Sequence, residues 1–206
     1  MIIEGLVPDP RRSASIRVMV GGRPVWTVPA DVVEALGLVA GRPLPAGAQE
    51  RLDRAADEEG AFRSALRALE RRAHGERELG LKLERKGHPP AAVAAALQRL
   101  VGLGLLDDVA FSRQYVQART VKGRGPVRLR HDLAMLGIAR DVINQVLSEL
   151  ATGGDDSLSR ARALVERRLP SLSGLPREAR RRRLTAFLAR RGYRAEASQI
   201  LEQLVP

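Results

Sequence analysis

The stretch GPVRLRHDLAMLG at residues 125–137 has a spacing that predicts a helix with a defined end. Leu129 and Leu133 are four residues apart, which places both side chains on one face of a helix. Gly137 follows four residues later, and glycine readily takes the left-handed conformation that ends helices. Pro126 suits the first helical position, where no backbone N–H is needed. We therefore predict a helix that begins at Pro126 and ends before Gly137.

The same spacing of two leucines and a glycine recurs as LGLKLERKG at 79–87 and as LTAFLARRG at 184–192. An apolar helical pattern follows each glycine, and another precedes each leucine pair. The marker glycines are 50 and then 55 residues apart. A three-helix unit buries little surface alone, so neighbouring units are expected to stack. The spacing therefore predicts three tandem three-helix repeats.

Acidic residues stand where the first helix of each repeat is expected to begin, as Asp57-Glu58-Glu59, Asp107-Asp108 and Asp155-Asp156. Aspartate at a helix N-terminus accepts hydrogen bonds from free backbone N–H groups and opposes the helix dipole. A metal site at the paired aspartates is an alternative that we favour much less. We therefore expect these residues to cap helices.

The N-terminal part has a different pattern. SIRVMVGGRPVWTV at 15–28 alternates side chains around Gly21-Gly22, which predicts a β-hairpin. Asp31 opens a short helix that stops at Gly37, and residues 39–48 have the glycine and proline density of a linker. A two-stranded hairpin is marginal alone, so we expect it to dock on the neighbouring helix or on the helical body. The expected fold is mainly α, with a β-hairpin module at 1–50 and three-helix repeats at 51–104, 105–152 and 153–206.

The charge is concentrated in the predicted repeats. The 206 residues have a net charge of +11, whereas residues 1–50 hold equal numbers of basic and acidic residues. A basic body favours nucleic acid or an acidic protein surface as its partner. The absence of cysteine excludes disulfides and thiolate catalysis. Without an evident signal peptide or a bilayer-spanning apolar run, we expect a cytoplasmic protein that does not contact membranes.

The glycines of VKGRG at residues 121–125 raise the question of a phosphate-cradling loop. Pro126 has no N–H to offer a phosphate, and no Lys-Ser or Lys-Thr pair follows, so we interpret the segment as a basic hinge before a helix. His74, His88 and His131 lack metal-ligand spacing and are expected to be solvated. We therefore predict no catalytic, cofactor-binding or metal-binding residue, and no enzyme activity.

Residues 64–150 resemble RecX, a family of bacterial regulators of the recombinase RecA. The matching segments are ELGLKLERKG (78–87), LLDDVAFSRQYV (105–116) and KGRGPVRLRHDLAMLGI (122–138). They are similar to the family's Glu-Leu and Lys-Gly segment, its Asp-Asp-x-x-Phe/Tyr helix and its Gly-Pro segment ending in Gly-Ile. The resemblance covers about residues 60–204, with a looser match at RRGYRAE (190–196). Residues 1–50 lie outside its most recognisable part.

This resemblance implies an elongated, curved body of three-helix repeats that binds RecA and lies along the groove of its filament on single-stranded DNA. It implies a regulator that inhibits the recombinase, ATPase and coprotease activities of RecA, and so modulates DNA repair, recombination and the SOS response. End-capping and groove-coating both stay open as mechanisms. We expect a monomer without a cofactor, with single- or double-stranded DNA as a further partner. The alternative is a general DNA-binding helical-repeat protein that acts independently of RecA.

Basic residues cluster on or just before the middle helix of each expected repeat. On one helix they would be interpreted as a solvated face, but equivalent placement in three repeats favours a continuous stripe. Such a stripe could contact DNA phosphates or RecA carboxylates. The candidate RecA- or DNA-binding residues are Arg77, Lys82, Arg85, Lys86, Lys122, Arg124, Arg128, Arg130, Arg177, Arg180, Arg181, Arg182, Arg183, Arg190 and Arg191.

Aromatic side chains are few, and single-stranded DNA is often bound by stacking on exposed rings. Tyr193, beside Gly192, is the one ring that we expect to be exposed. The rings at apolar helical positions are expected in the core, and these are Phe62, Phe111, Tyr115 and Phe187.

Overall fold

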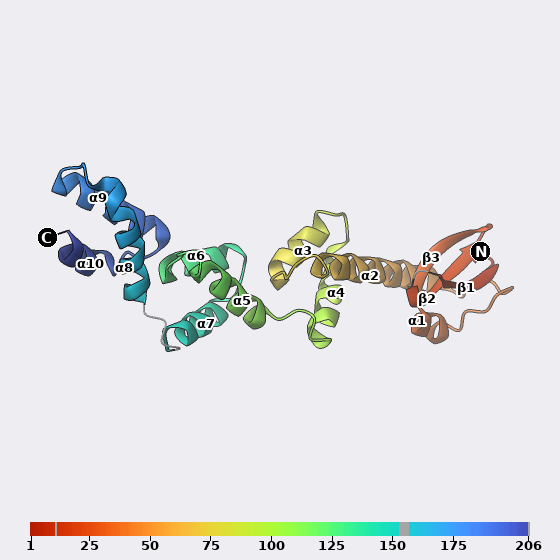
Figure 1. Ribbon diagram of the computed structural model, residues 1–206. Helices are drawn as coiled ribbons and strands as arrows, with labels where there is room; N and C mark the ends of the chain where they lie inside the picture. The colour runs from red at the N-terminus through yellow and green to blue at the C-terminus, as the bar shows by residue number, and fades with distance from the viewer. Residues whose placement is uncertain (11, 153–156, 206) are drawn as a thin grey trace. The chain divides into compact units, whose positions relative to one another are not determined.

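A computed structural model describes residues 1–10, 12–152 and 157–205 (Figure 1). The chain is mainly helical with a small N-terminal sheet, which confirms the predicted fold class. It divides into two compact units. The first comprises Met1–His74 and Glu78–Leu106, and the second comprises Gly75–Arg77 and Asp107–Pro206. None of the described helices is long and apolar enough to cross a bilayer.

An antiparallel sheet of order β1-β2-β3 begins the first unit. Gly21 and Gly22 have φ angles of 60° and 72° and connect the second strand to the third, so the predicted hairpin is confirmed. The sequence prediction missed the first strand, which is short and contains Pro8, because only its pairing with the second strand defines it. The strands are β1 (Gly5–Asp9), β2 (Arg12–Val20) and β3 (Arg23–Pro29).

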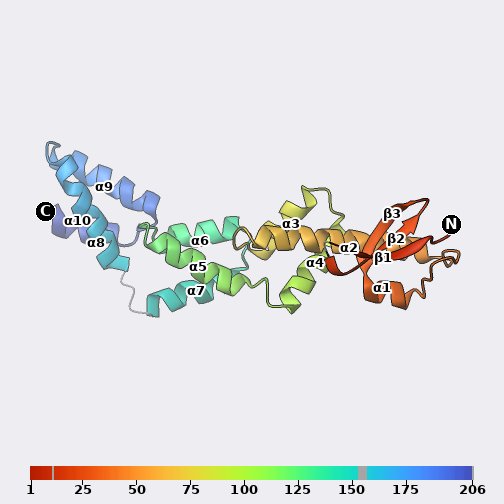
Figure 2. The ribbon, with the colours of Figure 1, turned by 45° about the vertical axis from the view of Figure 1, so that its right-hand side comes forward.

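The long helix α2 (Ala48–Leu69) begins against the sheet and continues into the first helical group (Figure 2). Leu52 is fully buried in one core with Val18 and Val28 of the sheet. The indole Nε1 of Trp26 donates a hydrogen bond of 2.6 Å to Asp53. The N-terminal module therefore docks on its neighbouring helix, as expected.

The expected helix start at Asp57-Glu58-Glu59 is wrong, because these residues lie inside α2. The helix begins after Gly47, which has a left-handed φ of 72°. Apolar residues at 48, 52, 55 and 56 continue the helical face toward the N-terminus, where the sheet covers it. The expected division at residue 50 therefore falls within one helix. The short helix α1 (Ala30–Ala35) precedes it and ends before Gly37, close to its expected bounds.

The remaining helices form three groups, each with its own hydrophobic core. The second half of α2 packs with α3 and α4 in the first group, and the other two groups follow in chain order. The elements are α3 (Glu76–Glu84), α4 (Pro90–Gly102), α5 (Asp108–Thr120), α6 (Pro126–Met135), α7 (Arg140–Thr152), α8 (Ser157–Arg168), the 3-10 helix η1 (Leu169–Leu172), α9 (Arg177–Arg191) and α10 (Ala197–Leu204).

The repeated leucine and glycine spacing defines the middle helix of each group. Gly87, Gly137 and Gly192 have φ angles of 88°, 83° and 90°, so each takes the predicted left-handed conformation after a helix. All six leucines of the pattern are fully buried, at Leu79, Leu83, Leu129, Leu133, Leu184 and Leu188. The pattern therefore fixes both the buried face and the end of α3, α6 and α9.

Within the second unit, two glycines also form a joint. The N–H of Gly125, just before α6, donates a hydrogen bond of 2.7 Å to the carbonyl of Arg191. A Cβ atom on Gly125 would lie 2.6 Å from the carbonyl oxygen of Gly192, and a Cβ on Gly192 would overlap the backbone of Arg128. The start of α6 and the end of α9 therefore meet backbone to backbone, which only glycine permits.

Candidate interaction surface

The basic residues around the hinge before α6 are largely engaged inside the protein. Asp132 is only 9% exposed, and its carboxylate is held by two guanidinium groups. Arg128 Nε lies 3.0 Å from Asp132 Oδ1, and Arg124 pairs with Oδ2. A buried carboxylate needs such compensation for its lost hydration. Two of the four basic residues predicted here thus stabilise the hinge. The spacing of Arg128 and Asp132, four residues apart on one helix, was the sequence signal that could have predicted their ion pair.

The other two basic residues of this segment are exposed. Arg130 donates from Nη1 to Oδ1 of Asn144 on α7, which orients its guanidinium. The side chain of Lys122 contacts no hydrogen-bonding or ionic partner among the described residues. Its backbone carbonyl instead accepts a hydrogen bond of 2.7 Å from Arg191. Arg191 also lies 5.4 Å from the Phe187 ring, so it serves the joint and not a free surface.

In the first unit, Lys82 belongs to a cluster that was not predicted from the sequence. Its Nζ lies 3.3 Å from His74 Nε2, and His74 Nδ1 lies 3.0 Å from Glu78. His74 is 2% exposed, so the expectation of a solvated side chain is wrong for this histidine. Burial lowers the pKa of His74, although the hydrogen bond to Glu78 opposes the shift. Neutral His74 can accept a hydrogen bond from the Lys82 ammonium, which explains why the two basic groups coexist.

Two further basic residues of α3 and the loop after it reach solvent. Arg85 is exposed, and its Nε donates to the carbonyl of Leu81 at 3.2 Å. Lys86 is exposed, with no hydrogen bond or ion pair in the described part of the chain. Arg77, at the start of α3, belongs to the second unit, where its side-chain stem lies over Gly137.

Helix α9 carries the largest group of exposed cations. Arg180 and Arg181 are half-buried, and Arg180 Nε is buried without a hydrogen-bond partner among the described residues. Within the described ranges, no carboxylate forms an ion pair with the other four arginines. These exposed residues are Arg177, Arg182, Arg183 and Arg190. This helix therefore keeps the charge that the hinge before α6 neutralises.

The remaining predicted polar residues have structural roles. Asp107 caps α5 by accepting hydrogen bonds from the N–H groups of residues 109 and 110, at 2.8 and 3.0 Å, as predicted. Asp108 accepts from the N–H of Glu76 at 2.8 Å and so caps α3. Asp155-Asp156 lie outside the described residues. His88 is half-buried, with Nε2 2.9 Å from a serine hydroxyl, so it is only partly solvated, whereas His131 is exposed as expected.

No aromatic ring in the described residues is fully exposed. Tyr193 is completely buried, so its expected exposure is wrong. The left-handed turn at Gly192 directs the chain inward, and the Tyr193 N–H bonds to the carbonyl of Leu188 at 2.9 Å. The other four rings pack on the cores as predicted: Phe62, Phe111, Tyr115 and Phe187. A stacking platform for bases is therefore not a property of this surface.

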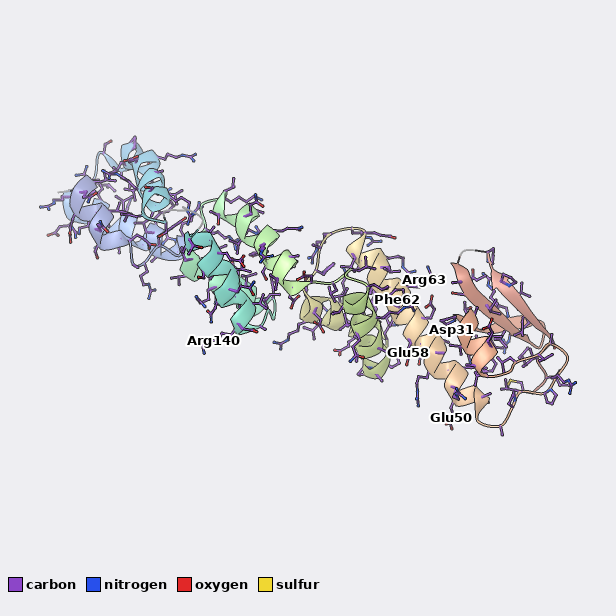
Figure 3. All side chains as sticks on the ribbon, turned by 90° about the horizontal axis from the view of Figure 1, so that it is seen from below. Asp31, Glu50, Glu58, Phe62, Arg63 and Arg140 are labelled. Atoms are coloured by element: carbon purple, nitrogen blue, oxygen red, sulfur yellow. The ribbon has the colours of Figure 1, made fainter. Side chains whose placement is uncertain are left out.

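A basic cavity in the second unit was also not predicted from the sequence. Arg77, Arg130 and Arg140 line a cavity of 590 Å³ together with Asn144. Arg140 stands at the start of α7 (Figure 3). The sequence contained only a weak signal for this cavity, because its arginines come from three elements that only the fold brings together.

Three sequence models of the RecX family match the helical part of the chain. The models for the first, second and third three-helix domains of RecX match residues 61–100, 107–147 and 155–199. The regulatory protein RecX of Halorhodospira halophila is 42% identical over 134 residues, covering 65% of this chain and 80% of the relative. That of Chlorobium phaeobacteroides is 36% identical over 138 residues, covering 66% and 87%.

Two crystal structures share the fold. One, of a regulatory protein RecX, has a TM-score of 0.80 at 20% identity and covers 98% of both chains. Another, of RecX from Lactobacillus salivarius, has a TM-score of 0.64 at 17% identity and covers 72% of this chain and 96% of the other. The first likeness extends over the N-terminal sheet, which the family models do not reach. With all three domains matched in order, the chain belongs to the RecX family of regulatory proteins.

Proposed function

We propose that this protein binds RecA filaments and inhibits the recombinase, ATPase and coprotease activities of RecA. The observation that carries this proposal is the ordered match of three RecX domains, together with relatives named regulatory protein RecX. The protein would act by occupying the filament and not by catalysis, with consequences for DNA repair, recombination and the SOS response. In the described residues, no group of three or more His, Cys, Asp or Glu side chains is placed to hold a metal.

The contact residues are best sought among the cations that have no internal partner. Internal pairing of Arg124, Arg128 and Arg191 makes these three structural, and Lys82 is engaged with His74. Among the candidate residues, the exposed cations whose side chains form no hydrogen bond or ion pair in the described chain are Arg77, Lys86, Lys122, Arg177, Arg182, Arg183 and Arg190. Their side chains can approach acidic groups of RecA or phosphates without breaking an internal interaction.

The test is DNA-dependent ATP hydrolysis by RecA from the same organism, on single-stranded DNA, with increasing amounts of the intact protein. We expect the rate to fall with protein concentration, and the protein to cosediment with preformed filaments. An unchanged rate at every ratio would refute inhibition. A Lys86→Gln, Arg182→Gln, Arg183→Gln variant should inhibit less, whereas Arg167→Gln, an exposed change on α8, serves as the charge control.

Binding to DNA without RecA is the second candidate function, favoured by the exposed arginines of α9 that form no ion pair within the described residues. Affinity dominated by phosphate contacts falls linearly with the logarithm of salt concentration. Titration of labelled single- and double-stranded oligonucleotides at several salt concentrations, in the absence of RecA, measures this dependence. Inhibition of RecA without measurable DNA affinity would assign the same arginines to RecA instead.

A further inference from the structure

We propose that the cavity between α6 and α7 is a phosphate-binding site. The cavity measures 590 Å³, and Arg77, Arg130 and Arg140 contribute three guanidinium groups to its lining. Its polar lining is completed by Asn144, and none of the described carboxylates lines it. The proposal does not depend on inhibition of RecA, because the site is complete within the second unit of this chain.

The arginines reach the cavity from three different elements. Arg130 belongs to α6, and the Asn144 Oδ1 atom accepts a hydrogen bond from its Nη1. This bond orients the Asn144 amide, whose two N–H donors stay available to a ligand. Arg140 is the first residue of α7 and is exposed (Figure 3). The described lining thus presents hydrogen-bond donors with little competition from acceptors.

Gly137 allows the third arginine to take part. A Cβ atom on Gly137 would overlap the Arg77 side chain and lie 2.8 Å from its Cβ. The bare backbone therefore gives the Arg77 stem a path across the turn after α6. The same glycine has a φ of 83°, which other residues rarely adopt. Gly137 thus ends α6 and also leaves room for the Arg77 side chain to line the cavity.

Part of the cavity lining is apolar. Ile138 and Ile143 line the cavity and are 5% and 2% exposed. Apolar lining beside the arginines strengthens their attraction for an anion relative to bulk water. Without a ligand, three like charges line one cavity, so an anion would also relieve their repulsion.

A phosphate fits this arrangement better than a protein carboxylate does. A carboxylate has only two oxygens, and in Asp132 two guanidinium groups already occupy both, so a third arginine would be left unmatched. A phosphate group offers oxygens in several directions and can accept from more than one arginine. The phosphate could come from a nucleic-acid backbone or from a free nucleotide, and titration with separate probes distinguishes these sources.

The chain offers a specific probe, because Asn144 is its only asparagine. Protein labelled with ¹⁵N at asparagine gives a single side-chain amide pair in a heteronuclear NMR spectrum, and that pair reports on the cavity. Inorganic pyrophosphate, ATP and an oligothymidine are each titrated into the full-length protein without RecA. We expect the Asn144 signals to shift with at least one of these probes.

The pattern of shifts identifies the source. A shift with oligothymidine alone points to a nucleic-acid backbone, and a saturable shift with pyrophosphate or ATP alone points to a free nucleotide. Either outcome supports the site. A saturable shift with all three probes also supports the site and shows that the phosphate group itself is recognised. Signals unmoved by all three probes overturn it.

Two variants test the arginines themselves. Arg140→Gln and Arg130→Gln should each lower, by ~10-fold, the affinity for the probe that shifts the Asn144 signals. Each substitution removes charge-assisted hydrogen bonds to the phosphate. Arg167→Gln removes the same charge from an exposed position on α8 and should change affinity much less. Equal losses in all three variants would show a general charge effect and would refute a defined cavity site.

Discussion

The basic segment before α6 and the basic helix α9 look alike in sequence but differ in the folded protein. In the first, Arg124 and Arg128 are committed to the buried carboxylate of Asp132. In the second, Arg182 and Arg183 are exposed and have no ion-pair partner in the described residues. A count of positive charges in the sequence therefore overestimates how many cations of the second helical group are available for binding. What decides whether a cation is available is the carboxylate that the fold places beside it.

The largest effect is expected at the joint where these two regions meet. Gly192→Ala introduces a side chain at a φ of 90° and against the backbone of Arg128. Left-handed strain and overpacking together should lower the free energy of unfolding by about 3 kcal/mol or more. Urea denaturation followed by circular dichroism measures the loss.

Gly87→Ala is the matched control, because Gly87 has a similar φ of 88° but nothing within 4 Å of the place where a Cβ atom would lie. It should cost only the conformational strain of about 1–2 kcal/mol. Equal losses in the two variants would mean that the close approach of α6 and α9 adds nothing to stability.

The next effect tests whether the pairing with Asp132 withdraws the hinge arginines from binding. Asp132→Asn removes the negative charge that holds Arg124 and Arg128. Since these arginines are partly solvated, the loss of stability should be about 1–3 kcal/mol. Affinity for single-stranded DNA should rise at the same time, and its dependence on the logarithm of salt concentration should steepen.

The control for this change is Glu202→Gln on α10, which removes one exposed negative charge far along the sequence. It should leave stability nearly unchanged and raise DNA affinity less. If both variants raise affinity equally, net charge alone is responsible and the comparison between the two regions loses its basis.

The sequence predicted the parts of the fold that depend on local spacing. The positions of Pro126, Leu129, Leu133 and Gly137 were enough to predict the start, buried face and end of α6, because the proline start, helix periodicity and left-handed glycine are local properties. The start of α2 could not be predicted in this way. Its first turns are stabilised by the sheet, and that packing joins distant parts of the chain.

The candidate site was predicted less well, because charge pairing depends on three-dimensional neighbours. Tyr193 looked exposed beside a glycine, yet the turn places it in the core. Arg140 was overlooked because it stands outside the basic runs, although it lines the same cavity as Arg130. Residue type and spacing identified which elements carry charge, but the fold decided which charges remain free.

A smaller effect is expected from the exposed arginines of α9. Arg182→Gln with Arg183→Gln should reduce the slope of log affinity against log salt by about 0.7 for each phosphate of a single strand that the variant no longer neutralises. Arg124→Gln, in the hinge, should change this slope little and should instead lower stability, because its partner Asp132 is buried. Filter binding across a salt series measures the slopes. A larger reduction of the slope in Arg124→Gln than in the α9 double variant would assign DNA binding to the hinge.

The smallest effect concerns pH and extends the comparison to the first helical group, where Lys82 is engaged with His74. Burial lowers the pKa of His74 in the folded protein below its ordinary value of 6.5. The unfolded chain therefore binds the proton first as pH falls, so the contribution of neutral His74 is present above pH 6.5 and is lost as pH falls toward its folded pKa. Unfolding free energies measured between pH 7.5 and about 5 should decline more steeply in the wild type than in His74→Gln. A parallel decline would show that His74 is as accessible to protons in the folded protein as in the unfolded chain.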